Sequence, residues 1–214
     1  MYIPATIDNN PTLVENDPEY VSFLDNLPEP LRSAWRYGDW DIFAGQYFTE
    51  WNPKLHVIPE TLAKKFGYGQ EYNKRYIGID WGYANPFACI WIEVTPKNTV
   101  FCYRELYGTE RHPLEWGQEI LARTGDEEIF MSLGDPSMWA RNPMSWNASH
   151  NPMYTDKSIA TALGEFVPNL VPANNSRVIG WRNMAQLMHY KKGQSPNFFI
   201  IEGKCPNLTR TLPE

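Results

Sequence analysis

The sequence has 214 residues, of which 43% are hydrophobic and 14% aromatic, and its formal net charge at pH 7 is −6. A chain of this length and composition can bury one good core plus an appendage, which excludes a disordered tail. It has no apolar run approaching about 18 residues and no amino-terminal signal pattern, so we expect a soluble intracellular protein without a membrane span.

Residues 1–74 are expected to form a helical segment that precedes the main domain. Asp17 is a candidate N-cap with proline at the first helical position, and helices are predicted over 20–27 and 30–37. The stretch 52–74 is polar and contains glycines, so it is the expected boundary.

The stretch from Arg75 to Gly82 is a short apolar run that delivers one carboxylate and stops at a glycine. Ile77 and Ile79 alternate with Gly78 at period two, which predicts a buried strand. Asp80 follows where this strand runs out. A carboxylate at the end of an apolar strand is costly to desolvate without a cation or donors, which indicates a metal or phosphate site, with a solvated turn aspartate as the alternative.

Two further strands are predicted over 87–94 and 99–107, each preceded by turn residues, so that three strands form an antiparallel meander. Apolar residues at helical spacing predict a helix over 113–123. The apolar run 129–133 is a further predicted strand. It ends in Gly-Asp-Pro, so a second carboxylate, Asp135, again lies at a strand exit.

The rest of the sequence contains predicted helices over 156–166, capped by Asp156, and 178–191, and predicted strands over 169–172 and 198–201. The helix over 178–191 is expected to bury the apolar side chains of Ile179, Met184, Leu187 and Met188.

The charge is unevenly distributed along the sequence. Residues 1–60 contain ten acidic and three basic side chains, whereas residues 136–210 contain eight basic and three acidic ones. Neutralisation of phosphates by basic side chains provides most of the non-specific affinity of proteins for nucleic acids. The basic stretch 136–210 could therefore bind a polyanion, and the alternative is an ordinary solvated surface. The three cysteines, Cys89, Cys102 and Cys205, are unpaired in spacing and are interpreted as buried reduced thiols.

The order strand, strand, strand, helix, strand, with carboxylates after the first and fourth strands, resembles the ribonuclease H fold. This is an α/β fold with a mixed sheet of three antiparallel strands followed by parallel ones, flanked by helices. Its first and fourth strands are parallel neighbours about 4.8 Å apart, so Asp80 and Asp135 would share a sheet edge. The expected cofactors are two Mg²⁺ or Mn²⁺ ions, which prefer oxygen ligands and lie about 3.5–4 Å apart in phosphodiester chemistry. Glu105 is a further candidate ligand, with an ion pair as its alternative.

Several stretches resemble the large subunits of tailed-bacteriophage terminases. Asp17 to Tyr20, 24–31 and Arg36 to Phe48 are similar to the segment that joins the ATPase and nuclease domains of these proteins. Arg75 to Pro86 is similar to the start of their nuclease domain, and Leu133 to Ser137 is similar to its second acidic motif.

The resemblance implies a metal-dependent endonuclease, over residues 75–214, that cuts concatemeric double-stranded DNA during packaging in the host cytoplasm. It implies the small terminase subunit and the portal protein as partners, and no membrane. Asp80 is expected to bridge the two ions and Asp135 to hold one of them. Asn175 to Arg177 resembles the family's Asn-x-Arg motif before a helix, whose backbone donors suit a DNA phosphate. The candidate DNA-binding residues are Arg141, Lys157, Asn175, Arg177 and Arg182, with surface ion pairing as the alternative for Arg177 and Arg182.

Two features depart from the family pattern. No phosphate loop of the form G-x-x-x-x-G-K-[ST] is present, so the ATPase is expected to be absent. The family's third carboxylate lies on a helix after the last core strand, and the sequence reaches Glu214 before that position. We therefore expect a fragment, or the product of a shortened gene, with weakened metal binding and doubtful cleavage by the isolated chain.

Two other functions fit part of the pattern. The Gly-Ile-Asp-x-Gly stretch at 78–82 also opens actin-like sugar kinases and ATPases, although Tyr83 stands where those proteins usually have Thr or Ser. A non-catalytic module that docks on the portal or small subunit is the other alternative. Plasmid nicking that depends on Mn²⁺ and on Asp80 would favour the nuclease. Hydrolysis of ATP would favour the kinase, and the absence of both activities would favour the non-catalytic module.

Overall fold

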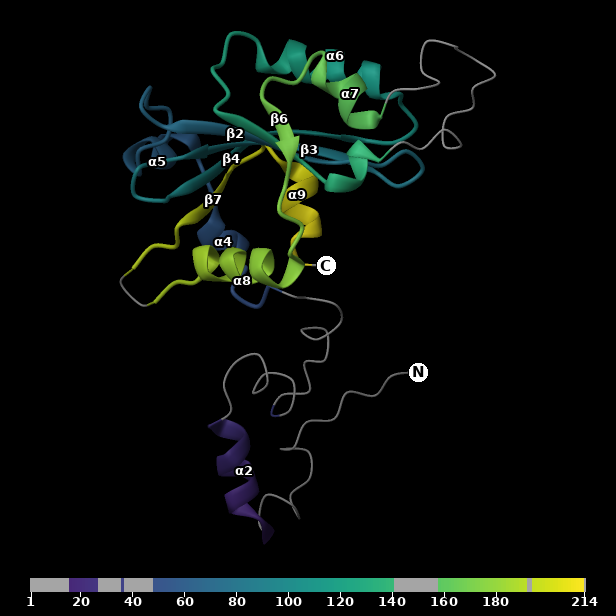
Figure 1. Cartoon of the computed structure of the whole chain (residues 1–214). Helices are drawn as coiled ribbons and strands as arrows, with labels where there is room; N and C mark the ends of the chain where they lie inside the picture. The colour runs from purple at the N-terminus through teal and green to yellow at the C-terminus, as the bar shows by residue number, and fades with distance from the viewer. Residues whose placement is uncertain (1–15, 27–35, 37–47, 141–157, 192–193, 214) are drawn as a thin grey trace. The chain divides into compact units, whose positions relative to one another are not determined.

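The computed structural model describes residues 16–26, 36, 48–140, 158–191 and 194–213 (Figure 1). The chain divides into two compact units, Asn52–Thr209 and the remaining residues at its two ends. In the latter unit, helix α2 (Pro18–Asp25) begins as predicted, since the N–H of Tyr20 donates to Oδ1 of Asp17 at 3.0 Å. Almost all of the helix predicted over 30–37 lies outside the described residues.

The unit Asn52–Thr209 is built on a seven-stranded mixed sheet in the order β1-β7-β4-β3-β2-β5-β6. Its strands are β1 (Val57–Ile58), β2 (Lys74–Asp80), β3 (Phe87–Val94), β4 (Val100–Gly108), β5 (Met131–Gly134), β6 (Leu170–Pro172) and β7 (Phe198–Ile201). β2, β3 and β4 pair antiparallel, whereas β5 is parallel to β2, β6 to β5, β7 to β4 and β1 to β7. The predicted mixed sheet, with an antiparallel meander followed by parallel strands, is confirmed.

Helices flank both faces of this sheet. They are α4 (Pro53–His56), α5 (Glu60–Lys65), α6 (Pro113–Thr124), the 3-10 helix η3 (Pro136–Trp139), α7 (Ile159–Gly164), α8 (Arg177–Met188) and α9 (Pro206–Thr211). α6 and α7 lie together over one face, while α8 and the start of α9 lie on the opposite side (Figure 1). Within the described residues, no helix combines the length and the apolar composition that a membrane crossing needs.

The core follows from the period-two pattern of β3. Phe87, Cys89 and Trp91 are each 0% exposed, because alternate residues of the strand face α6. The Phe87 ring stacks on Trp116 of α6 with centroids 4.5 Å apart, and Nε1 of Trp91 donates to Oγ1 of Thr124 at 3.0 Å. The three cysteines are free and buried, as predicted.

The compact unit begins at Asn52, earlier than the boundary expected after residue 74. The stretch 52–74 contributes α4, β1 and α5 to it. β1 pairs in parallel with β7, and Ile58 and Ala63 are 5% and 0% exposed in the shared core. A strand of two residues is too short to show a period-two pattern, which is why the sequence did not reveal it.

Two helices differ from expectation. In α8, Met188 is buried and Leu187 is partly buried, but Ile179 is 57% exposed. The apolar residues of α8 lie around the whole helix, so their spacing does not define one buried face. α7 begins at Ile159 with Ser158 as its N-cap, whose Oγ accepts from the N–H of Thr161 at 3.1 Å. The predicted cap for that helix, at position 156, lies outside the described residues.

Candidate active site

Asp80 and Asp135 lie at the same edge of the sheet, at the exits of neighbouring parallel strands. Ile79 of β2 is in register with Gly134 of β5. Asp80 directly follows Ile79, and Asp135 directly follows Gly134. Neighbouring strands are about 4.8 Å apart, so the backbones at the two positions are adjacent. The structure therefore places the two predicted aspartates at neighbouring backbone positions, and their role as metal ligands stays a prediction.

The turn after Asp80 depends on Gly82, which is buried. A Cβ at this position would collide with the carbonyl oxygens of Asn85 and Pro86. These oxygens belong to backbone, which cannot move aside as a flexible side chain can, so only glycine fits without a shift of the turn. Gly82 thereby fixes the path of the chain as it leaves the first carboxylate.

Asp135 is held by the first turn of η3. Its Oδ1 accepts a hydrogen bond of 2.8 Å from the N–H of Ser137, and Pro136 occupies the first helical position. This bond orients the carboxylate at the end of β5. A carboxylate has two oxygens with about four lone-pair sites, so one capping bond is compatible with a cation ligand.

Glu105 has a structural role. It is 8% exposed; its Oε1 accepts from the backbone N–H and Nδ2 of Asn207 at 2.8 and 2.7 Å, and its Oε2 accepts from the N–H of Leu208 at 3.0 Å. The first N–H groups of a helix have no partner within it, and a carboxylate satisfies them well. Both expectations for Glu105, metal ligand and ion pair, are therefore corrected to the capping of α9.

Asp80 and Asp135 at the sheet edge suit a divalent cation, because together they form a pair of carboxylate ligands. No group of three or more His, Cys, Asp and Glu side chains arranged to hold a metal ion occurs among the described residues. α9, which follows the last strand, contains no acidic residue. Mg²⁺ commonly binds through one or two carboxylates, together with water and substrate phosphates. Asp80 and Asp135 provide hard oxygen donors of this kind.

A third strand exit lies beside the two carboxylates. β6 is parallel to β5, with Pro172 in register with Gly134, and the N–H of Ala173 donates to the carbonyl of Gly134 at 2.8 Å. The chain therefore leaves β6 at the edge where Asp135 lies. Asn175, one of the predicted DNA-binding residues, follows two positions after Ala173 and is exposed.

The other predicted DNA-binding residues are only partly described. Arg182 is exposed on α8. α8 begins at Arg177, whose side chain lies outside the described part of the structure. Arg141 and Lys157 also lie outside it. The role of these residues in DNA binding stays a prediction.

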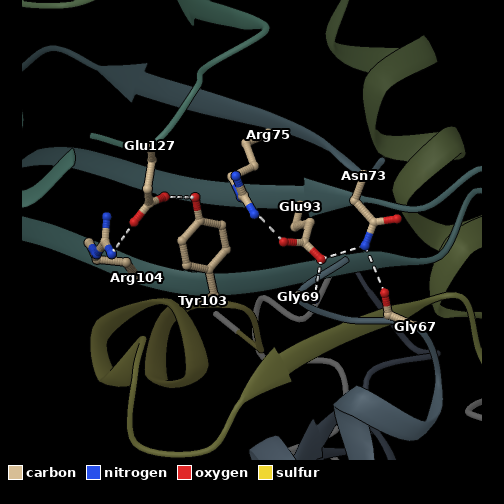
Figure 2. A network of polar contacts seen from close by, with 8 residues as sticks. All are labelled: Gly67, Gly69, Asn73, Arg75, Glu93, Tyr103, Arg104 and Glu127. Atoms are coloured by element: carbon tan, nitrogen blue, oxygen red, sulfur yellow. Dashed lines mark hydrogen bonds and ion pairs between the residues drawn. The ribbon is translucent and has the colours of Figure 1, made fainter. Parts of the chain in front are cut away.

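A buried polar network supports β2 at the end opposite Asp80 (Figure 2). Glu93 of β3 is 1% exposed, and its Oε1 accepts from the N–H of Gly69 and from Nδ2 of Asn73, both at 2.6 Å. Its Oε2 lies 3.4 Å from Nε of Arg75, the second residue of β2. The donors and the positive charge allow a carboxylate to be buried in this strand.

The network continues on β4, where Tyr103 and Arg104 Nη2 donate to the two oxygens of Glu127 at 2.7 and 2.5 Å (Figure 2). Burial, followed by the hydrogen bond to Glu127, raises the pKa of Tyr103 well above its ordinary value. Burial and then the charge of Glu93 raise the pKa of the neighbouring Tyr68 to about 12. Sequence patterns did not reveal this network; its one signal was Glu93, a carboxylate within an otherwise apolar strand.

Comparison with known proteins identifies the fold. No protein-family model matches the sequence, and no curated protein matches it either. The large terminase of a thermophilic bacteriophage matches with a TM-score of 0.52 and 16% identity, over 92% of this chain and 44% of that chain. The P22 large terminase nuclease domain matches with a TM-score of 0.53 and 12% identity, over 76% of this chain and 75% of that one. The chain has the fold of a terminase nuclease domain.

This terminase nuclease fold is of the ribonuclease H-like type, and it agrees with the predicted fold class. At 12–16% identity the similarity establishes the fold alone. The chain spans less than half of the thermophilic bacteriophage protein, 44% of its length. The actin-like alternative is not favoured, because the matching structures are terminases.

Proposed function

We propose that this chain is the nuclease part of a phage terminase large subunit, and that it cuts concatemeric double-stranded DNA in a metal-dependent reaction. The observation that carries the proposal is the adjacent placement of Asp80 and Asp135 at the exits of two parallel strands in a terminase nuclease fold. Ligands commonly bind at the carboxyl ends of strands in α/β sheets, which is where both side chains lie.

The carboxylates of Asp80 and Asp135 would hold Mg²⁺ or Mn²⁺ as oxygen ligands. When bound, two such metal ions would lower the pKa of a coordinated water and stabilise the leaving oxygen of a phosphodiester. The protein's own contribution is to position the ligands. The tight turn at Gly82 fixes the exit of β2, and the bond from Ser137 orients the carboxylate of Asp135.

The DNA would lie across the edge where β2, β5 and β6 end. The exposed Asn175 follows the exit of β6, and α8 begins two residues later, so the backbone donors of this segment would suit a phosphate. The cations of Arg177 and Arg182 on α8, and of Arg141 and Lys157, would add electrostatic attraction to the DNA backbone. The sequence resemblance supports the small terminase subunit and the portal protein as partners, and the host cytoplasm as the location.

Nicking of a supercoiled plasmid in the presence of Mn²⁺ tests the proposal. Substituting a residue that only supports a metal ligand typically lowers activity by about 10–100-fold. Asp80→Asn and Asp135→Asn remove a ligand itself, so each should lower the nicking rate by more than this. Asp126→Asn is the matched control, because Asp126 is an exposed aspartate in the turn after α6. It should nick the plasmid at the wild-type rate.

Two results would contradict the proposal. Nicking that survives both Asp80→Asn and Asp135→Asn would place the active site elsewhere or reveal a contaminating nuclease. If the wild-type protein does not nick the plasmid either with or without Mn²⁺, the result would instead favour the non-catalytic packaging module.

A further inference from the structure

Asp80 shares its face of the sheet with a tyrosine of β4. Asp80 is in register with Ala88 of β3, and Ala88 is in register with Tyr107 of β4. Residues that lie directly opposite each other on paired strands project from the same face. The three residues therefore form one row across the carboxyl end of β2, with the small side chain of Ala88 between the carboxylate and the phenol.

This face is less tightly packed than the opposite one. On β3, Phe87 is 0% exposed and stacks on Trp116 of α6, whereas Ala88, on the Asp80 face, is partly exposed. Gly78 lies two residues before Asp80 on β2 and so shares its face. A Cβ at Gly78 would meet none of the described atoms within 4 Å. The room beside Asp80 therefore lies on this face of the sheet.

Glu105 shows which helix covers part of the same face. It lies two residues before Tyr107 on β4, so the two side chains alternate onto one face. It accepts hydrogen bonds from the N–H groups of Asn207 and Leu208 at the start of α9. α9 thus lies on the Asp80 side of the sheet, and α6 lies on the other side (Figure 1). Tyr107 comes after this anchor, toward the carboxyl end of the strands.

Tyr107 provides a neutral donor beside the candidate metal site. The residue is partly exposed, and within the described part of the chain its hydroxyl forms no hydrogen bond. Two strand spacings separate its backbone from that of Asp80, which amounts to about 10 Å. Side chains stand roughly perpendicular to a sheet, so the phenol and the carboxylate border the space over Ala88 from two sides. A side chain on a paired strand is also held more precisely than one on a loop.

We propose that Tyr107 binds the DNA backbone, with its hydroxyl donating to an oxygen of a phosphate that lies beside Asp80. The proposal rests on the proposed nuclease function, which brings the DNA to Asp80. Tyrosine hydroxyls are among the groups that contact phosphates in protein–DNA complexes. An arginine at this position would pair with the carboxylate of Asp80 itself. A neutral hydroxyl leaves that carboxylate available to a cation, so Tyr107 positions the strand and takes no part in proton transfer.

Fluorescence anisotropy of a labelled DNA duplex tests the contact without cleavage. It is measured in EDTA, and again in Ca²⁺, which binds carboxylate oxygens. Tyr107→Phe should weaken binding in Ca²⁺ by about 10-fold, as expected for the loss of one hydrogen bond to a charged group. The slope of log K against log salt should stay at its wild-type value, because no charge is removed.

Tyr72→Phe is the matched control for this measurement. It removes the same hydroxyl from a residue that is 68% exposed and precedes β2. The seven residues of β2 place it about 20 Å or more from Asp80. Its duplex affinity should stay within about 2-fold of wild type. Equal affinities of Tyr107→Phe and Tyr72→Phe in both buffers would overturn the proposal.

The ¹⁹F spectrum of protein labelled with 3-fluorotyrosine reports on the residue itself. The chain contains twelve tyrosines, and Tyr107→Phe and Tyr72→Phe each assign one resonance by deleting it. Saturating duplex should shift the resonance of Tyr107 and leave that of Tyr72 in place. A Tyr107 resonance that does not move in either buffer contradicts the contact. Both variants keep the aromatic ring, so their melting temperatures should match the wild type.

Kinetics separate this proposal from the proposed nuclease function. A contact made equally in the ground state and the transition state changes KM alone. Tyr107→Phe should therefore raise the KM of nicking by about 10-fold and leave kcat within about 2-fold. If nicking depends on Asp80 while Tyr107 is silent in binding and in the ¹⁹F spectrum, the Tyr107 contact fails alone. If Tyr107 responds to the duplex but nicking does not depend on Asp80, the nuclease centre fails and DNA binding on this face stands.

Discussion

Glu105 of β4 accepts two hydrogen bonds from one distant residue, Asn207, at 2.8 Å from its backbone nitrogen and 2.7 Å from its Nδ2. The two residues are 102 positions apart in sequence. The contact therefore ties the start of α9 to the middle of the sheet. Leu208 adds a third bond, so that the carboxylate is fully engaged in holding the helix.

Glu105→Gln should lower the free energy of unfolding by about 1–3 kcal/mol. The amide replaces one acceptor oxygen with a donor that faces the N–H groups of α9, and it leaves a buried group unsatisfied. Urea denaturation followed by circular dichroism measures the change. Glu128→Gln, at an exposed position, should stay within about 0.5 kcal/mol of wild type. Equal stability of the two variants would contradict the role given to Glu105.

Gly82→Ala should destabilise the protein, and Gly78→Ala should not. A methyl group at Gly82 meets the carbonyl oxygens of Asn85 and Pro86, whereas one at Gly78 has no atom within 4 Å. Overpacking of this kind costs about 1–3 kcal/mol, against a change of about 0.5 kcal/mol or less at Gly78. Urea denaturation of both variants checks the difference. A Gly82→Ala protein with wild-type stability would show that the turn after Asp80 can relax.

Mn²⁺ should raise the melting temperature of the wild-type protein but not that of Asp80→Asn. At ten times its dissociation constant the ion stabilises the folded state by about 1.4 kcal/mol, which corresponds to roughly 3–6 °C for a chain of this size. Without metal, Asp80→Asn should melt at or above the wild-type temperature, because neighbouring carboxylates repel. Differential scanning fluorimetry in EDTA and in Mn²⁺ gives both values.

The control for this experiment is Asp126→Asn, which should respond to Mn²⁺ as the wild type does. An equal rise in the melting temperature of wild type and Asp80→Asn would show that the ion binds elsewhere on the protein. Such a result would count against the metal site.

Tyr68 should make the stability pH-dependent in alkaline solution. Its pKa is raised from 10.0 to about 12 in the folded protein, so the folded state keeps a proton that the unfolded state loses. The stabilisation is fully present below pH 10 and is lost as the pH rises through about 12. Urea denaturation of Tyr68→Phe should therefore vary less with pH in this range than that of the wild type.

The cause of this shift can be tested separately by ultraviolet titration of the tyrosinates. Because the charge of Glu93 raises the pKa of Tyr68, Glu93→Gln should lower it. The difference spectrum between wild type and Tyr68→Phe assigns the titration to this residue. A pKa of Tyr68 that does not change in Glu93→Gln would leave burial as the main cause of the shift, with the charges of Glu60 and Glu127 as smaller ones.

Local sequence patterns were enough to locate most strands. Alternating apolar residues and flanking turns predicted strands over 87–94 and 198–201, which are the bounds that the structure shows. The same reasoning placed Asp80 and Asp135 directly after apolar runs. These are local properties, because the side-chain period and the turn residues of a strand depend on its own sequence.

The sequence by itself therefore determined the strand runs, the antiparallel meander and a carboxylate at each of two strand exits. Tertiary structure alone decided that Glu105 holds α9, that β1 completes the sheet edge beside β7, and that the indole N–H of Trp116 is buried without an acceptor among the described residues. Each of these depends on which distant segment packs against the residue. That choice is made by register and burial across the whole sheet, and it leaves no periodic trace in the neighbouring sequence.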